Sequence, residues 1–445
     1  MQYSFRSIAA LAAVALACAF PPTLFALDAS PSEGLIESDA VRRKITDEWL
    51  DDEINHVLAL KKAEYTDRYL YRFSVSQKKD ASGGFLAVTV KPEDSPGIRG
   101  TWVLFRNLAD GQADSIRIYP TDDPSVYVRL RPSGDPLKGR SFLDLVILET
   151  EALHGVPIGI TFFQLYGASF SSVVGMTRTT VPWQLVANAH NRSPETEAAV
   201  QAIRDGIKNL VYLDDGAFNE RGEPVLIETG KPQDPKAILA ARGKNHPVGD
   251  VYGGVNCSGF AKWIVDGIVR PRAGAGLLIE PLKGLTPVPD NLFTDPFMSE
   301  RDIFFGLNWT RNLAAAVVSL DTGRTVKPEN AGVDVTVEPM SALPPYQQSV
   351  GYRAGSLAPL LYYLAVSEPG HFYLGAVSRE RGNPPLREFH HIAAFFPYFD
   401  ETGKFTIAVF ESAAETTIES FSSRNADAFV NLVRIKIPEN GHFEP

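Results

Sequence analysis

The sequence predicts an α+β protein in which a mostly-β region precedes a domain that combines helices with a strand-rich C-terminal end. Two observations support this prediction. Short runs of strand-forming residues, separated by turn residues, fill the region from 66 to 150. Further along the chain, a helix with an apolar face is expected to begin at Cys257, and strand-like runs follow it between 371 and 412.

The chain begins with the layout of a secretory signal peptide. Arg6 provides a short positive region, an apolar run covers 8–20, and prolines and small residues follow. We therefore expect residues 1–26 to be removed and the mature chain to be exported to the periplasm or cell envelope. Two alternatives remain open: the apolar run is retained as a membrane tether, or Cys18, which follows Ala-Leu-Ala, carries a lipid anchor.

Composition narrows the class of protein. The net charge is −10 and no basic tract is present, which argues against nucleic acid as a partner. The chain has 2 cysteines, and removal of the signal peptide would leave Cys257 alone. Exported proteins usually pair or avoid cysteines. A single thiol therefore indicates either a reactive group or a small buried apolar residue.

The N-terminal half divides into a helical segment and a β-rich domain. Residues 27–65 are expected to be helical, because apolar residues recur at helical spacing over 38–64. Residues 66–188 are expected to form an antiparallel sandwich or barrel with a binding role, since no helices interrupt the strands and no reactive constellation is present. The expected strands are 85–90, 100–108, 114–120, 125–132 and 141–149.

The remaining domain spans 189–445. Its first helix is expected to begin at Pro194 with Ser193 as the N-cap. Residues 270–350, rich in proline and glycine, are expected to form a long insertion with one helix near 310–320, which lines or covers a cleft. The other expected elements are a helix over 356–366 and strands over 371–378, 388–399 and 404–412.

Cys257 lies where a thiol can be activated. Asn256 can cap the following helix, which places Cys257 in the first turn. There, unsatisfied backbone N–H groups and the positive end of the helix dipole favour a thiolate, and the same N–H groups can bind an oxyanion. Gly253 and Gly254 leave room for a substrate chain, so Cys257 is a candidate nucleophile.

A cysteine nucleophile needs a base and a group that orients the base. His390 and His391 lie on one predicted strand, and Ala393 and Ala394 offer each of them a small neighbour, so strand alternation does not decide between them. Glu411, at the end of the next strand, can accept a hydrogen bond from the imidazole. Adjacent strand residues face opposite ways and no further ligand spacing is present, so no metal site is expected.

The segment "YGGVNCSGFAKWI", residues 252–264, resembles the cysteine segment of the NlpC-type cell-wall peptidases. In that family an aromatic residue, two glycines and Asp-Cys-Ser-Gly precede an apolar helix. The family's histidine strand, roughly His-Val-Gly-Ile-Tyr, is similar to residues 391–395, and this similarity selects His391 over His390. The third polar residue of the family falls at Glu411.

The resemblance, over about 195–270 and 355–415, implies a papain-like fold, in which the nucleophile helix packs on an antiparallel sheet. It also implies a cysteine peptidase that cuts peptidoglycan peptides without a cofactor. Cys257 would attack the amide carbonyl, His391 would act as acid and base, and Glu411 would orient the imidazole. The residues expected to bind the substrate peptide are Tyr252, Gly253, Gly254 and Ser258.

Three departures from the family pattern keep other functions open. Asn256 stands where aspartate is usual, Glu411 replaces a histidine or amide, and the separation of Cys257 and His391 is longer than is typical. One alternative is thiol-dependent acyl transfer to another envelope substrate. Another is an envelope binding protein that has kept the fold without activity. Tyr252 is explained equally well by packing.

Overall fold

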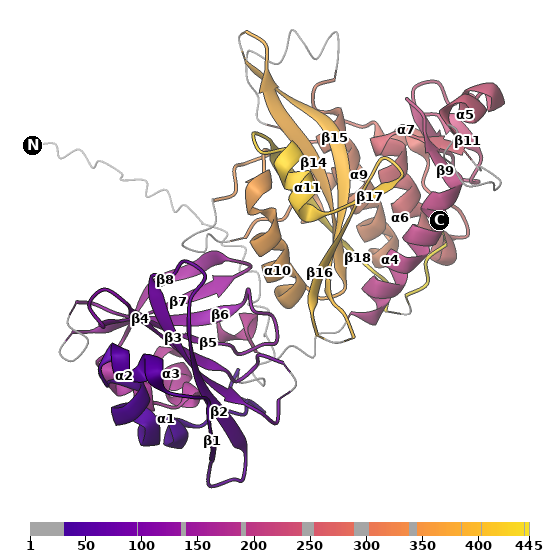
Figure 1. Cartoon of the computed structure of the whole chain (residues 1–445). Helices are drawn as coiled ribbons and strands as arrows, with labels where there is room; N and C mark the ends of the chain where they lie inside the picture. The colour runs from indigo at the N-terminus through magenta and orange to yellow at the C-terminus, as the bar shows by residue number, and fades with distance from the viewer. Residues whose placement is uncertain are drawn as a thin grey trace, which may run out of the picture.

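The computed structural model describes residues 31–95, 97–134, 139–187, 193–242, 253–288, 302–337, 345–383, 385–401, 403–439 and 441–444. The chain forms two lobes, with the N-terminal half in one and the C-terminal half in the other (Figure 1). The predicted signal peptide, Cys18 and Tyr252 lie outside the described residues. Among the helices described, none is long and apolar enough to cross a membrane.

The N-terminal lobe contains one eight-stranded antiparallel meander in which each strand pairs with its neighbours in the sequence. Strands β1 and β8 are its two edges, so the expected sandwich or closed barrel is wrong. The five predicted strands correspond to β3–β7. The strands are β1 (Ala63–Thr66), β2 (Arg72–Lys79), β3 (Phe85–Pro92), β4 (Trp102–Asn107), β5 (Ala113–Ile118), β6 (Tyr127–Pro132), β7 (Ser141–Ile147) and β8 (Thr150–Ile158).

The N-terminal helical segment is not the single helix expected over 38–64. α1 (Asp39–Ile45) continues into the π-helical turn η1 (Thr46–Leu50), and α2 (Ile54–Ala59) follows a break. At the break, the side chain of Asp52 accepts a hydrogen bond from Glu53 N at 2.7 Å, which competes with helical bonding. These helices and α3 (Phe170–Thr177) lie together beside the sheet and share its apolar core (Figure 1). The helices before residue 65 and the sheet after it therefore pack together in one lobe.

The C-terminal lobe is organised around a six-stranded antiparallel sheet of order β13-β18-β14-β15-β16-β17. The three strands predicted from the sequence, β14, β15 and β16, are confirmed, whereas β18 was not predicted although it lies inside the sheet. The bounds are β13 (Tyr352–Arg353), β14 (His371–Arg381), β15 (Leu386–Phe399), β16 (Phe405–Glu411), β17 (Ala414–Thr416) and β18 (Phe429–Lys436).

Helices cover both faces of this sheet. The apolar residues of one face pack with α4 (Pro194–Gly206), α6 (Cys257–Ala273) and α9 (Phe305–Thr322). Those of the opposite face pack with α10 (Leu357–Ser367) and α11 (Ile418–Arg424). The smaller elements are α5 (Pro235–Ala241), α7 (Ile279–Leu282), β9 (Leu210–Tyr212), β10 (Gly216–Phe218), β11 (Pro224–Leu226) and β12 (Gly253–Val255).

Two expectations about this lobe need correction. The helix predicted within 270–350 is α9, whose Leu307, Trp309 and Leu313 are fully buried, so it is a core helix and not part of a cover over a cleft. Ser193 precedes α4 as expected, but its side chain does not cap the helix. Its hydroxyl instead accepts a hydrogen bond from Gly370 N at 3.1 Å, which ties the start of α4 to β14.

The two lobes share one apolar core cluster. α10 is buried on the face of the C-terminal sheet that also contacts the end of the N-terminal lobe. Tyr362 of α10 donates a hydrogen bond from its hydroxyl to the carbonyl of Leu185 at 2.9 Å. The lobes are therefore packed together through α10, which lies at their junction (Figure 1).

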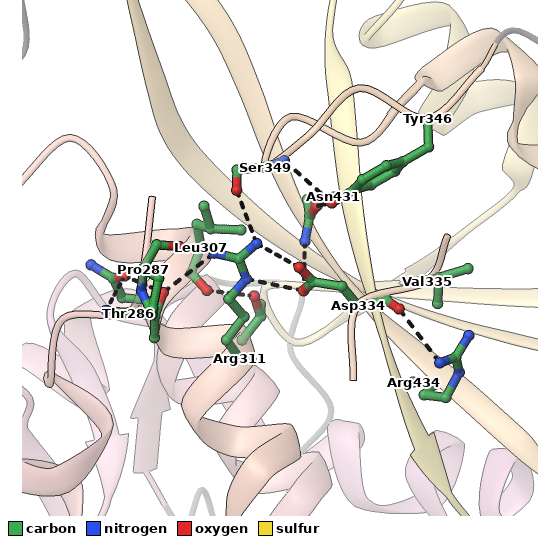
Figure 2. A network of polar contacts seen from close by, with 12 residues as sticks. Thr286, Pro287, Leu307, Arg311, Asp334, Val335, Tyr346, Ser349, Asn431 and Arg434 are labelled. Carbon is green, nitrogen blue, oxygen red and sulfur yellow. Dashed lines mark hydrogen bonds and ion pairs between the residues drawn. The ribbon is translucent and has the colours of Figure 1, made fainter. Parts of the chain in front are cut away.

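A polar network around Arg311 ties several loops to α9 (Figure 2). The guanidinium donates to both carboxylate oxygens of Asp334, at 3.0 and 2.5 Å, and to the carbonyl of Pro287 at 2.9 Å. It also donates to the hydroxyl of Ser349 at 3.2 Å. Pro287, Asp334 and Ser349 belong to different segments. The buried side chain of Arg311 therefore connects the segment before α9, the segment after α9 and the segment that leads into β13.

We expect Arg311→Met to lower the free energy of unfolding by about 2 kcal/mol, because Asp334 loses its charged partner and two loop contacts lose their donor. Asp334 is 27% exposed, so water compensates in part. Urea denaturation followed by circular dichroism measures the change. Adding Asp334→Asn to the variant should recover part of the loss. A midpoint equal to wild type would contradict the prediction.

Candidate active site

Cys257 is the first residue of α6, as the sequence predicts. Asn256 has an extended backbone, and its side-chain oxygen accepts a hydrogen bond from Gly259 N at 2.8 Å. This cap satisfies one of the free amides of the first turn. The amides of Cys257 and Ser258 come too early in the helix to reach an intrahelical acceptor, so they can bind an anionic oxygen.

Gly253 and Gly254 have a packing role. Both are buried in β12, and a Cβ on Gly254 would lie 2.3 Å from the side chain of Leu213. A Cβ on Gly253 would lie 2.8 Å from Pro224. The side chain of Gln233 also bonds both backbone groups of Gly254, at 2.8 and 2.7 Å. The expectation that substrate approaches these glycines is wrong, because the chain's own side chains fill that space.

β15 brings His391 to the thiol. The imidazole lies beside the thiol and lowers its pKa, and the backbone N–H of Ile392 acts in the same direction. The Nε2 of His391 lies 2.8 Å from Oε2 of Glu411, which leaves Nδ1 as the ring nitrogen for the thiol. The structure thus places Cys257 next to His391, which is itself hydrogen-bonded to Glu411.

An irregularity in the sheet separates the two adjacent histidines. β14 and β15 change register between Val377 and Ser378, and His390 is the extra residue that this shift leaves unpaired. Its Nδ1 contacts the carbonyl of Glu388 at 3.4 Å. His391 is still in register, opposite Val377. The bulge therefore distinguishes the histidines, which strand alternation alone could not do.

Glu411 is held from two sides. The residue is 8% exposed, and its Oε2 binds His391 while its Oε1 forms an ion pair with Arg424. Arg424 ends α11, a helix that the sequence did not predict, so no local signal pointed to it. A buried carboxylate with two cationic partners is well placed to hold the imidazole in one orientation.

The pKa values of the three groups favour a charged pair. Burial alone would lower the pKa of His391, but its hydrogen bonds to Cys257 and Glu411 and their charges raise that pKa to about 9. Burial alone would raise the pKa of Cys257, but the hydrogen bond and charge of His391 outweigh it and lower the pKa. Burial likewise opposes ionisation of Glu411, whose pKa is nevertheless lowered by His391 and Arg424. The thiolate of Cys257 and the imidazolium of His391 therefore stabilise each other.

Ser258 supports the site from inside the protein. It is 4% exposed, and its hydroxyl lies 3.9 Å from the sulfur of Cys257. Its carbonyl accepts a hydrogen bond from Nε1 of Trp309 on α9 at 2.9 Å. Because the side chain is buried, the expectation that Ser258 binds substrate is wrong. Trp309, which anchors the first turn of α6, was not anticipated.

One group of residues in the described part of the chain has the spacing of a metal site, and it lies in the N-terminal lobe. It consists of Asp144, Glu151 and His154. Arg129 and Arg131 already donate to Asp144, at 2.7 and 2.8 Å. Two guanidinium groups on the buried carboxylate oppose the binding of a cation, so the group is best described as an ion-pair network.

We expect Glu411→Gln to shift the pH dependence of thiol alkylation. The charge of Glu411 raises the pKa of His391, and the charge of His391 lowers the pKa of Cys257. Removing the carboxylate therefore raises the pH at which the thiolate forms. The rate of reaction with iodoacetamide is measured from pH 5 to 10. In wild type the rate should rise at a pH below the ordinary thiol pKa of about 8.5. In the Glu411→Gln variant the rise should occur at a higher pH, closer to the ordinary thiol pKa. Coincident curves would contradict the proposed coupling.

Comparison with known proteins gives one match. The model of a domain of unknown function, DUF8515, matches residues 31–185, less than half of the chain. This segment begins before α1 and ends at the last residue of η3 (Trp183–Leu185), so it includes both the N-terminal helices and the eight-stranded sheet. No curated protein and no solved structure matches the chain.

Proposed function

We propose that the chain is an exported cysteine hydrolase that cleaves an amide bond in a peptidoglycan peptide. The observation that carries the proposal is the placement of Cys257, at the start of a buried helix, beside His391, which is hydrogen-bonded to Glu411. A nucleophile helix packed on an antiparallel sheet is also the arrangement implied by the resemblance to the NlpC-type peptidases. The signal-like N-terminus supports export, and the peptide substrate class rests on the resemblance.

In the proposed reaction, the thiolate of Cys257 attacks the carbonyl carbon of the amide. Negative charge develops on the carbonyl oxygen, where the amides of Cys257 and Ser258 can stabilise it. The imidazolium of His391 donates its proton to the leaving nitrogen, which departs as an amine and leaves a thioester on Cys257. Neutral His391 then takes a proton from water as the water attacks the thioester, and the carboxylate product leaves.

The decisive test uses purified peptidoglycan. The mature chain is incubated with it, and the released peptides are separated and identified by mass spectrometry. We expect new amine and carboxyl ends that are absent with Cys257→Ala, a variant that removes only the sulfur. Products that need an added acceptor amine or alcohol would indicate acyl transfer instead. The absence of any Cys257-dependent product would refute the hydrolase and favour a binding protein.

A further inference from the structure

A cavity lies in the N-terminal lobe, apart from the Cys257 site. Its volume is about 890 Å³, within the range of sites for small ligands. One wall is the segment 50–55, which joins η1 to α2, and another is the hairpin 108–113 between β4 and β5. Phe163 and Tyr166, from the turn η2 (Phe163–Gly167), complete the lining.

A buried arginine lines this cavity. Along β4, Trp102 and Leu104 face the apolar core and Arg106 continues that series, whereas Phe105 faces the other way. Arg106 is 7% exposed. Its Nε donates to the carbonyl of Gly111 at 3.0 Å, but one terminal guanidinium nitrogen is buried with no hydrogen-bond partner among the described residues. A buried cation with an unsatisfied donor is costly unless a ligand supplies acceptors.

A phenol stands beside the guanidinium. Tyr166 is 4% exposed, and its ring packs edge-on against Trp102 and Phe162. Burial raises the pKa of Tyr166 well above its ordinary value, although the nearby charge of Arg106 acts in the opposite direction. The hydroxyl therefore stays protonated and can donate. Within the described chain it forms no hydrogen bond, so this part of the cavity carries two kinds of free donor.

The rest of the cavity has the opposite charge. Its other ionisable lining residues are Asp51, Asp52, Glu53 and Asp110, and all of them are partly or fully exposed. Apolar side chains such as Leu50, Ile54 and Leu108 also line the cavity. The cavity therefore offers a cation and a hydroxyl in its interior, an apolar wall, and carboxylates near solvent.

We propose that this cavity binds a short peptide with free termini. Its α-carboxylate would accept hydrogen bonds from the Arg106 guanidinium and the Tyr166 hydroxyl, and its ammonium would lie among the outer carboxylates. A planar guanidinium matches the two oxygens of a carboxylate. A phosphate dianion would meet the same arginine but would be repelled by four carboxylates on the way in. The assignment concerns the matched domain and does not depend on the activity of Cys257.

Titration calorimetry with three probes tests the assignment. The protein is the mature chain carrying Cys257→Ala, so that the probes cannot be hydrolysed. Tri-alanine should bind saturably. Tri-alanine amide, which lacks the carboxylate, should bind at least about tenfold more weakly than tri-alanine. N-acetyl-tri-alanine, which lacks the ammonium, should bind several-fold more weakly than tri-alanine. The second loss is smaller because the outer carboxylates are better solvated than Arg106. No saturable binding of tri-alanine, or equal binding of the free acid and the amide, would overturn the proposal.

Variants locate the binding. Arg106→Gln should remove the preference for the free acid over the amide, and Tyr166→Phe, which keeps the packed ring, should weaken tri-alanine binding several-fold. Arg117→Gln is the matched control, because Arg117 stacks on Phe105 and Tyr127 on the opposite face of the same sheet. It should leave binding unchanged. If Arg106→Gln does not fold, Tyr166→Phe and the amide probe decide. Unchanged affinity in a folded Arg106→Gln variant would contradict the assignment.

Discussion

Replacing His391 with alanine is expected to lower the rate of peptide release from peptidoglycan by about 10³-fold, within the range typical of a lost general acid–base group. The variant loses the imidazolium that stabilises the Cys257 thiolate and that would protonate the leaving amine. Since the pKa of His391 is about 9, the imidazolium is present below that pH and lost above it. Wild-type activity that depends on it should therefore fall as the pH rises through about 9.

His390→Ala is the matched control for this prediction. His390 is adjacent in sequence and has the same chemistry, but its ring contacts the carbonyl of Glu388. Its removal should change the rate less than about twofold, as expected for a residue outside the reacting groups. The rates of both variants and of wild type are measured at pH 7 with the same substrate. If the two histidine variants lose activity equally, the assignment of the base is wrong.

Gly259→Ala is expected to lower the free energy of unfolding by about 3 kcal/mol, the upper part of the range for overpacking. A Cβ at this position would lie 2.0 Å from the carbonyl oxygen of Gly216 and 2.9 Å from Ala217. These atoms belong to the backbone of β10, which cannot rotate away as a flexible side chain can. The start of α6 must therefore move, and the thiol of Cys257 moves with it. Thiol alkylation should lose its low-pH reactivity in the same variant.

Gly175→Ala provides the control for Gly259→Ala. Gly175 also lies within a helix, α3, but it is exposed and a Cβ there would meet nothing within 4 Å. This change should leave stability unaltered or raise it by about 0.5 kcal/mol, because alanine is the better helix former. Urea denaturation of both variants measures the difference. A Gly259→Ala protein as stable as the control would show that the close contact between α6 and β10 can relax.

Some features could be predicted because their causes are local. The start of α6 depends on Asn256 and the glycine three residues later, which are close in sequence and interact in the structure. Strands β3–β7 follow from alternation and intervening turns, and hairpin connections make sequence neighbours pair. The proximity of Cys257 and His391 was inferred through a family resemblance, and the two residues lie together in the structure.

Other features depend on contacts between distant segments. β18 is buried on both faces between β13 and β14, so its pattern lacks the alternation of a half-exposed strand. The helix in 270–350 was expected at the periphery, because proline and glycine surround it, yet α9 packs in the core against α6 and the sheet. The proline and glycine content of this segment reflects the loops that flank α9. Whether α9 itself is buried depends on which apolar faces it packs against in the folded protein.

The sequence by itself determined a capped helix with a thiol in its first turn, a β-rich N-terminal region and three strands near the C-terminus. Strand alternation left the choice between His390 and His391 open and the family resemblance favoured His391, whereas the bulge at His390 that separates the two residues depends on pairing between β14 and β15. The tertiary structure also decided that Arg424 holds Glu411 in place. It further decided that neighbouring side chains fill the space beside Gly253 and Gly254. Local hydrogen bonds act within a few residues and can be seen in the sequence, whereas register and packing exist only once distant segments are in contact.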